Sequence, residues 1–481
     1  MAGNEMTPEA VLARHAAALE RRRPWESVWR ECYDHVLSAT PGSGGPMLYD
    51  ATAADAAEQL SASLLAELTP PWSRWFGLAP SRALEQGPDA AAAAATLEEA
   101  AEVLQGHLDR SNFVLEMHQS FLDLVVAGTG VLLVEEAPPG ESSALRFTAV
   151  PLTQAVLEEG AGGRLDTIYR AMVLDAAAIA RRYPRAILPA GLKPEAEGEA
   201  PGRFRVVEAV WPDGQGGCGY QAVLDHDGRA VPLATGRFAD SPFIAFRWLK
   251  APGETYGRGP VMKTLPDIRT ANKVVELVLK NASIAATGIW QAEDDGVLNP
   301  ATVRLTPGAI IPKAPGSSGL TPLAAPGNFD VSELVLEDLR KRIRSAMLAD
   351  RLSAPQDARM TATEVLERSA QTARLLGATY GRLQAELLTP LVARCLAILR
   401  RRGEVPPMLL DGREVRLTYQ SPLARVQGRA DAANTLLFLQ AASALGAEAT
   451  AQIDVAAATR HLARALAAPA GILTPIAPTE E

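Results

Sequence analysis

Cysteine is scarce in this chain, with three residues in 481. Cys32, Cys218 and Cys395 lie far apart, and the sequence contains no CxxC pair. This distribution argues against a disulfide framework or a zinc site and is typical of idle thiols in a reducing compartment. Aromatic residues are also few, at 5%, and alanine supplies much of the 47% apolar content. Closely packed helices are therefore expected in preference to a β-sandwich.

Long apolar runs are missing as well. The N-terminal stretch MAGNEMTPEAVLARH has no apolar core of the kind that a secretory signal needs. No run of about twenty apolar residues follows, so we expect no membrane span. The net charge of −9 argues against a protein that grips nucleic acid over most of its surface. This net charge is still compatible with a few basic residues that contact nucleic acid locally.

The common catalytic motifs are absent too. Gly-Lys never occurs, which excludes a GxxxxGK[ST] phosphate loop, and neither HExxH nor GxSxG is present. The six histidines are scattered, with none at a metal-ligand spacing on one helix face. Gly214, Gly216 and Gly219 match GxGxxG, but a strand-like run stands on both sides, which predicts a hairpin turn. We therefore expect no enzyme, no cofactor and no metal site.

What the sequence does contain is mainly helix, around a β-rich middle. Helical patterns begin at Thr7-Pro8, at about residue 50 and at the alanine block near residue 90. Trp25 and Trp29 lie four residues apart on one helical face and are predicted to anchor the core. Between about 130 and 250, short alternating runs separated by Gly, Pro and Asp predict twisted antiparallel strands. The expected fold class is α+β, mainly α-helical.

Two helices are predicted on either side of a Gly/Pro-rich stretch at 287–328. The first begins at Pro260, a residue suited to a first helical turn, and Pro266 should bend or restart it. Two rows repeat every seven residues and predict a seam for another helix. The rows consist of Val261, Ile268, Val275 and Ala282, and of Leu265, Asn272, Leu279 and Ala286. The second helix is predicted over 329–352.

A further long helix is predicted from about 361 to 402. Thr361 and Glu364 form a capping box, in which each side chain can satisfy the other residue's backbone N–H. Pro390 lies inside this helix and should kink it, because proline removes one backbone hydrogen bond and crowds the preceding turn. After it come a strand in REVRLTYQ, two alanine-rich helices and a proline-rich tail.

Basic residues gather on the helix at 329–352 and around the break that follows it. Two interpretations stay open: a solvated face that complements the helix dipole, or positions that face DNA phosphates without reading bases. The residues concerned are Arg340, Lys341, Arg342, Arg344, Arg351 and Arg359.

Taken in order, several segments resemble viral portal proteins, above all the podovirus-type head-to-tail connector family. They are AGTGVLLVEE (127–136), YGRGPVMKTLPDIRTANKV (256–274), MTATEVLER (360–368) and SPLARVQ (421–427). The resemblance extends over about 5–465. It implies a portal-type fold with wing, stem, clip and crown regions. We expect no long C-terminal barrel, because few residues remain after 428.

The resemblance implies the following regions. They are a wing over 1–255, a first stem helix over 256–286, a clip over 287–328, a second stem helix over 329–352, a tunnel loop over 353–360, a long wing helix over 361–402 kinked at Pro390, a returning strand and loop over 403–427, and crown helices with a loose tail over 428–481.

The implied function is mechanical. A homo-oligomeric ring, commonly of twelve subunits, would occupy one capsid vertex of a bacteriophage and pass double-stranded DNA during packaging and ejection. The implied partners are the terminase large subunit, a tail adaptor, and the major capsid and scaffolding proteins, with no membrane. The chain would be made in the host bacterial cytoplasm and end in the virion.

The residues that the resemblance points to fall into three sets. Channel-facing candidates are Arg340, Lys341, Arg344, Arg351, Gln356 and Arg359; Thr361 and Glu364 would cap the helix beside the tunnel loop; docking candidates in the clip are Trp290, Asp294, Asp295, Arg304 and Lys313. Two alternatives stay open on the residues alone. One is a hydrolase or transferase built on the middle α+β region, and the other is a non-viral oligomeric helical adaptor.

Overall fold

Helices and antiparallel sheets make up the chain, as the α+β prediction requires. The computed structural model describes residues 6–37, 47–71, 73–81, 90–189, 202–226, 228–287, 290–292, 314–316, 320–322, 329–349, 377, 379–408, 415–419, 422–446 and 451–466. Among the helices within these ranges, none is long and apolar enough to cross a membrane.

The first described part of the chain contains the helices α1 (Pro8–Val36), α2 (Thr52–Leu68), α4 (Ala90–Arg110) and α5 (Phe113–Ala127). Thr7 caps α1 as predicted, because its side chain accepts a hydrogen bond from the Ala10 backbone N–H at 3.2 Å. Gly128 ends α5 in the left-handed conformation, with φ 77°. The helices predicted to begin at Thr7-Pro8, at about residue 50 and near residue 90 are therefore present.

Two antiparallel sheets form the middle of the chain, as predicted. One has the strand order β3-β2-β9, with β2 at Thr129–Glu136, β3 at Leu145–Ala149 and β9 at Phe243–Arg247. The other has the order β4-β5-β6-β7-β8, and its strands are β4 (Ala155–Glu159), β5 (Leu165–Leu174), β6 (Phe204–Pro212), β7 (Cys218–His226) and β8 (Arg229–Phe238). A short helix, α6 (Ala176–Arg182), follows β5.

The glycine-rich stretch after β6 is a hairpin turn. Pro212 at the end of β6 pairs with Cys218 at the start of β7. Gly214 and Gly216 between them have φ angles of 75° and 84°, which only glycine adopts readily. The prediction of a turn in place of a dinucleotide site is confirmed.

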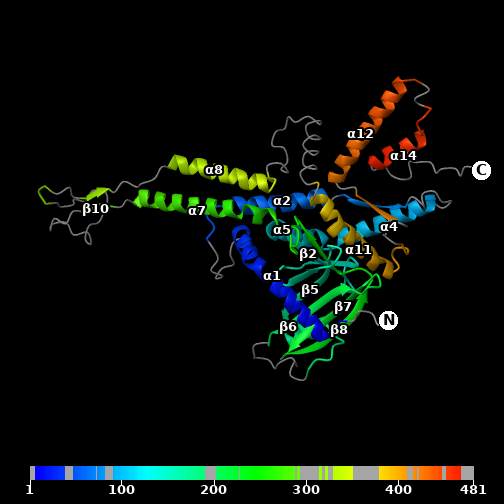
Figure 1. The fold of residues 1–481 in the computed structure, drawn as a ribbon, viewed down its shortest axis with the longest axis horizontal. Coiled ribbons are helices and arrows are strands. Elements are labelled where there is room, and N and C mark those ends of the chain that lie inside the picture. The colour runs from blue at the N-terminus through cyan, green and yellow to red at the C-terminus, as the bar shows by residue number, and fades with distance from the viewer. Residues whose placement is uncertain are drawn as a thin grey trace, which may run out of the picture.

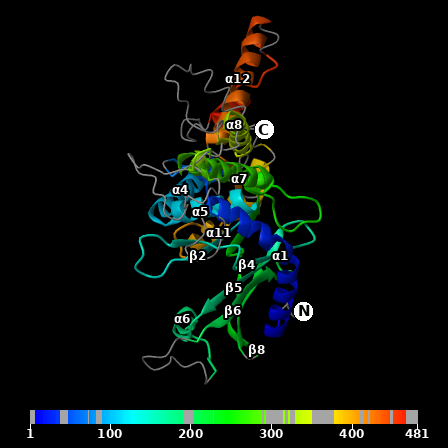
Figure 2. The ribbon, with the colours of Figure 1, turned by 90° about the vertical axis from the view of Figure 1, so that its left-hand side faces the viewer.

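Two helices extend together away from the sheets. These are α7 (Pro260–Thr287) and α8 (Phe329–Ala346), which pack side by side and form an arm (Figure 1). A short antiparallel pair, β10 (Trp290–Ala292) with β11 (Leu320–Pro322), lies beyond them. Seen along the arm, the sheets lie on one side of it and α12 on the other (Figure 2). The helix α7 is continuous through Pro266.

The last part of the chain contains a π-helical turn at Gln384–Leu388, then α11 (Thr389–Arg401), β12 (Val415–Tyr419), α12 (Pro422–Ala444) and α14 (Val455–Ala465). Residues 422–427 were predicted as loop but form the first turns of α12, because Pro422 has the fixed φ that suits a first helical position. The predicted helix start at Thr361 lies outside the described residues.

The strand β12 pairs with β1 (Phe76–Pro80), which the sequence did not predict. The five residues of β1 follow a Pro-Pro turn and are too short for a clear two-residue period. This pair links the N-terminal helices to the C-terminal part of the chain.

The largest apolar core is built mainly from helices, with α2, α4, α5, the base of the arm and α11 packing around it. A second cluster lies between α1 and the sheets. Trp29 is 4% exposed there, with its ring centroid 5.0 Å from that of Tyr256 and 6.1 Å from that of Trp25. The tryptophan pair is thus a core anchor, as predicted.

Candidate functional site

The base of the arm belongs to the core of the molecule. On α7 the buried hydrophobic residues are Val261, Leu265, Ile268 and Ala271, each 4% exposed or less. Leu339 and Ile343 on α8, and Met347 directly after it, are buried in the same cluster. The first half of the predicted seam therefore packs within the chain.

The outer half of the arm is different, because it leaves apolar side chains in water. Leu277 and Leu279 on α7 are 49% and 52% exposed, and Leu334 and Val335 on α8 are 70% and 44% exposed. Leu279 belongs to the seven-residue rows that predicted a helix-packing seam. Within one chain Leu279 thus stays about half exposed, although α8 packs beside α7.

Asn272, at the midpoint of the same row, has a different role from the one predicted. Its side-chain oxygen accepts hydrogen bonds from the backbone N–H groups of Tyr49 (2.6 Å) and Asp50 (3.2 Å), and its amide nitrogen donates to the Met47 carbonyl at 3.1 Å. It therefore fixes the segment that leads into α2. A residue in a helix-packing seam would instead contact another helix. A polar side chain is stable at this position because backbone groups satisfy its hydrogen-bonding atoms.

Asp50 continues this connection to α8. Arg340 donates to its carboxylate at 2.8 Å, and the Asp50 side chain is 4% exposed. Burial alone would raise the pKa of Asp50, but the hydrogen bonds from Thr52 and Arg340 hold it below its usual value. Asn272 and the Asp50–Arg340 pair together form a clasp between the arm and the N-terminal helices.

The basic cluster on α8 is therefore divided between two environments. Arg340 is engaged in the clasp, and Arg342 reaches Asp267 on α7 at 3.3 Å. Lys341 and Arg344 lie exposed on the same helix. Of the described cations that were predicted to face the channel, Lys341 and Arg344 therefore point into solvent.

Most of the other predicted site residues fall outside the described part of the chain. These are Arg351, Gln356, Arg359, Thr361, Glu364, Asp294, Asp295, Arg304 and Lys313. Trp290 is described only by its backbone, in β10, where it pairs with Pro322.

Pro390 lies in the second position of α11, directly after the π-helical turn. The Thr389 backbone N–H bonds to the Gln384 carbonyl, five residues back, and the Thr389 hydroxyl donates to the same oxygen at 2.9 Å. A proline in this place cannot donate to the carbonyl four residues earlier and would crowd it. The widened turn accommodates both effects, so the distortion predicted at Pro390 takes the form of a π-bulge.

The widened turn also carries Glu386, the partner of a buried arginine. Arg247 is fully buried at the end of β9, and its Nη2 donates to Glu386 Oε1 at 2.7 Å while Nη1 donates to Glu159 at 2.9 Å. Burial alone would lower the pKa of Arg247, but its hydrogen bonds with Glu386 and Glu159 raise it. Sequence reasoning missed this network, because its members come from three distant stretches of chain and no local spacing connects them.

Three glycines bring α5 and α7 into backbone contact. A Cβ on Gly257 would lie 2.1 Å from the Gly128 carbonyl oxygen, and one on Gly259 would lie 2.5 Å from the Val125 carbonyl oxygen. These glycines come from the quoted segments AGTGVLLVEE and YGRGPVMKTL. The two motifs are therefore the two sides of one junction at the root of the arm.

The carboxylates and thiols of the described residues offer little catalytic chemistry. Glu208 accepts from Arg182 (2.8 Å), Tyr183 (2.8 Å) and Tyr220 (3.1 Å), so it is engaged structurally. Burial raises the pKa of Cys32 to about 12 and that of Cys218 to about 11, which makes both thiols poor nucleophiles. No group of metal-ligating side chains occurs within the described ranges.

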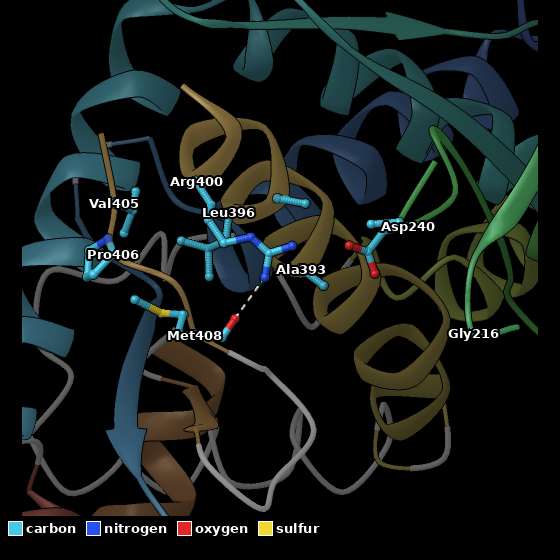
Figure 3. Close-up of a pocket in the computed structure, with 10 residues that line it drawn as sticks. Gly216, Asp240, Ala393, Leu396, Arg400, Val405, Pro406 and Met408 are labelled. Atoms are coloured by element: carbon cyan, nitrogen blue, oxygen red, sulfur yellow. Dashed lines mark hydrogen bonds between the residues drawn. The ribbon is translucent and has the colours of Figure 1, made fainter. Parts of the chain in front are cut away.

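A pocket of about 290 Å³ lies between the β6–β7 turn, the β8–β9 turn and the outer face of α11 (Figure 3). Its walls combine polar surface with apolar side chains such as Leu396, Val405 and Met408. Its arginine, Arg400, donates to the Met408 carbonyl at 3.2 Å. We assign no ligand to this pocket.

Comparison with known proteins gives a consistent result. The sequence profile of a family described as "Bacteriophage head to tail connecting protein" matches residues 9–473. The chain is similar to the probable portal protein of Bordetella phage BPP-1, with 23% identity over 466 residues that cover 89% of this chain and 80% of that protein. It is also similar to the portal protein of Salmonella phage epsilon15, with 22% identity covering 94% and 86%.

Similarity to the portal protein of Escherichia phage T7 is more limited, at 21% identity covering 64% of this chain and 56% of that protein. Among solved structures, the chain is similar to a chain in the virion of a native gene transfer agent particle, with 14% identity and a TM-score of 0.35, covering 85% of this chain and 94% of that one.

Proposed function

Because the chain belongs to the bacteriophage head-to-tail connecting protein family, we propose that copies of it form a closed ring through which double-stranded DNA passes between head and tail. Proteins of this family are structural connectors, so the chain is a connector and not an enzyme. The proposed place of the ring is one capsid vertex of the virion.

The observation that carries the ring proposal is the outer half of the arm. Four large apolar residues on two neighbouring helices are about half exposed or more, and a soluble protein seldom leaves such a group in water unless another molecule covers it. A heterologous contact between identical copies closes into a ring when its rotation permits. The arm of the next copy is the natural cover, because it presents the same apolar helices.

In this arrangement α7 and α8 are stem helices that surround the channel. Lys341 and Arg344 are the described cations that remain for contact with DNA phosphates, whereas Arg340 serves the clasp with Asp50. A few basic positions on an acidic protein suit a channel in which DNA slides without sticking, because each phosphate contact adds salt-dependent affinity.

The remaining assignments are part of the same proposal. Residues 287–328 would form the clip, on which the terminase large subunit and later the tail adaptor dock; 353–360 would be the tunnel loop; the major capsid and scaffolding proteins would contact the wing. The helices α12 and α14, which pack on each other, would form the crown.

The test is the assembly state of the purified chain. Mass photometry should give a particle near twelve times 51.0 kDa, and negative-stain images should show a ring with a central hole. A monomer, or a small oligomer without a hole, across the concentration range of the measurement would refute the ring.

A further inference from the structure

A second pocket, of about 260 Å³, lies on another side of α11 from the one in Figure 3. Residues from β2, α6, β6, β7, β8, β9, the β8–β9 turn and α11 line it. Leu133, Phe238 and Phe243 supply apolar and aromatic walls, and several charged side chains share the lining. This combination of apolar walls and a few polar groups is typical of ligand pockets.

The carboxylates of this pocket already have cationic partners. Glu208 pairs with Arg182 at 2.8 Å, and Glu135 lies 3.6 Å from the same guanidinium. Glu136 pairs with Arg401, at the end of α11. These pairs account for two of the three arginines and all three carboxylates that line the pocket.

The third arginine, Arg394, is bound differently from the other two. It is 4% exposed, and it donates hydrogen bonds to the backbone carbonyls of Val134 (Nε, 3.2 Å) and Asp240 (Nη1, 3.3 Å). Its guanidinium lies 4.9 Å from the centroid of the Phe238 ring. Among the described residues, no carboxylate forms an ion pair with it.

Burial is the main influence on the charge of Arg394, and it lowers the pKa of this residue. The positive charge of Arg401 lowers it further, while the carboxylates of Asp240 and Glu135 act in the opposite direction without reversing the shift. An arginine stays charged even so, because its intrinsic pKa is too high for release of the proton in a protein. A buried charge without a partner is costly, and an anionic group that enters the pocket would relieve that cost.

We propose that this pocket is a binding site for a carboxylate, with the Arg394 guanidinium as its anchor. A planar carboxylate matches the fork of guanidinium N–H groups better than any neutral group. A more highly charged anion such as phosphate is disfavoured, because Glu135, Glu136 and Glu208 surround the same space. The apolar walls select a carboxylate carried on a hydrophobic or aliphatic stem.

Two sources can supply such a group: a small organic acid, or a glutamate or aspartate side chain of another protein chain. The site itself rests on Arg394 and its surroundings and is independent of ring formation. The probe for the site is 4-fluorobenzoate, observed by ¹⁹F NMR with the full-length protein, and its neutral counterpart is 4-fluorobenzamide.

We expect 4-fluorobenzoate to bind saturably and about tenfold or more tightly than 4-fluorobenzamide, because charge-assisted bonds to guanidinium exceed neutral ones. Arg394→Met should abolish this preference. The matched control is Arg400→Met on the same helix, since Arg400 lines the other pocket, and it should leave binding unchanged. Equal binding of acid and amide to the wild-type protein, or a preference that survives Arg394→Met, would overturn the site.

A measurement that needs no variant covers the case in which Arg394→Met does not fold. Electron cryomicroscopy of the wild-type protein with 4-bromobenzoate should show density beside Arg394; density elsewhere alone would overturn the proposal. Competition then identifies the source. Displacement by N-acetylglutamate methylamide at lower concentration than by acetate assigns the site to a protein side chain, and the reverse order assigns it to a small acid.

Discussion

Arg247 shows how one buried charge connects three separate parts of the chain. It ends β9, and its guanidinium reaches Glu159 at the end of β4 and Glu386 in the turn before α11. Its backbone N–H also donates to Glu386 at 2.9 Å. Two carboxylates and two backbone carbonyls accept hydrogen bonds from this guanidinium, so Arg247 is the shared cation of a buried network.

Arg247→Met should lower the free energy of unfolding by about 3 kcal/mol, because it removes the buried cation that Glu159 and Glu386 share and leaves them only Lys250 and Arg382 as partners. Chemical denaturation followed by circular dichroism would measure the loss. Arg23→Met removes an ion pair whose arginine side chain is 74% exposed, and the expected change is below about 1 kcal/mol. A similar loss of unfolding free energy in both variants would show that the buried network stabilises the fold no more than a surface ion pair does.

Asp123 is a buried carboxyl that should give the protein an unusual pH dependence. Burial raises its pKa to about 7, although the hydrogen bond from Tyr33 (2.7 Å) acts in the opposite direction. The unfolded chain releases this proton at about pH 4 and the folded chain at about 7. Stability from this group is therefore present below pH 4 and is lost as the pH rises to 7.

Asp123→Asn should remove that loss. The melting temperature of the variant relative to the wild type should rise between pH 4 and pH 7 and stay constant above 8. Scanning fluorimetry of both proteins across this range is the measurement. Other titrating groups, such as His15 with its pKa lowered to about 4, are common to both and cancel. A difference that is flat with pH would mean that Asp123 is not protonated in the folded state.

At the scale of elements, the junction between α5 and α7 depends on the absence of side chains. Gly128, Gly257 and Gly259 let the two backbones touch, with positions for a Cβ between 2.1 and 2.5 Å from backbone atoms. Backbone atoms cannot move aside as the end of a flexible side chain can. The start of α7, and with it the direction of the arm, is fixed here.

Gly259→Ala should destabilise the protein by about 1–3 kcal/mol or more, as overpacking does, since the new methyl would lie 2.5 Å from the Val125 carbonyl. Gly162→Ala is the matched control, because no heavy atom lies within 4 Å of its Cβ position. Thermal unfolding of both variants gives the comparison. If Gly259→Ala were as stable as the control, the backbone contact would not be as close as described.

The elements that the sequence predicted well are those with local signals. The start of α7 at Pro260, the strands of the middle region and the hairpin at Gly214 and Gly216 each follow from neighbouring residues. The strand β1 has five residues and pairs with β12 more than three hundred positions away, so no local pattern reveals it. The Arg247 network and the role of Asn272 are equally non-local.

The candidate site was predictable to a smaller degree. The seven-residue rows indicated that α7 has packing faces, but they could not show that its base packs within the chain and its outer half faces water. The basic cluster on α8 was visible in the sequence, yet its division between Arg340 in the clasp and the exposed Lys341 and Arg344 depends on Asp50, far away in the chain. Spacing along one helix does not contain that information.

At the scale of the whole molecule, the arm is the feature that a single chain does not explain. It extends away from the rest of the chain (Figure 1). Its base is buried in the main core, and its outer half exposes leucines on both helices. Burial of those leucines against neighbouring copies would stabilise every interface of a ring through the hydrophobic effect.

Leu279→Asp combined with Leu334→Asp should therefore convert the ring into monomers or small oligomers while circular dichroism stays unchanged, because a charge at the interface must be desolvated. Mass photometry measures the distribution. Leu115→Asp alters a leucine on α5 that is 74% exposed and should leave the ring intact. Rings that persist in the double variant would place the interface elsewhere.

The clasp at the root of the arm also has a mechanical meaning. Asn272 grips the segment before α2, Asp50 grips α8 through Arg340, and α2 in turn packs on α5. A torque applied to the tip of the arm is thus delivered to α2 through the clasp and to α5 through the glycine junction. The N-terminal helices therefore resist rotation of the arm at two separate points.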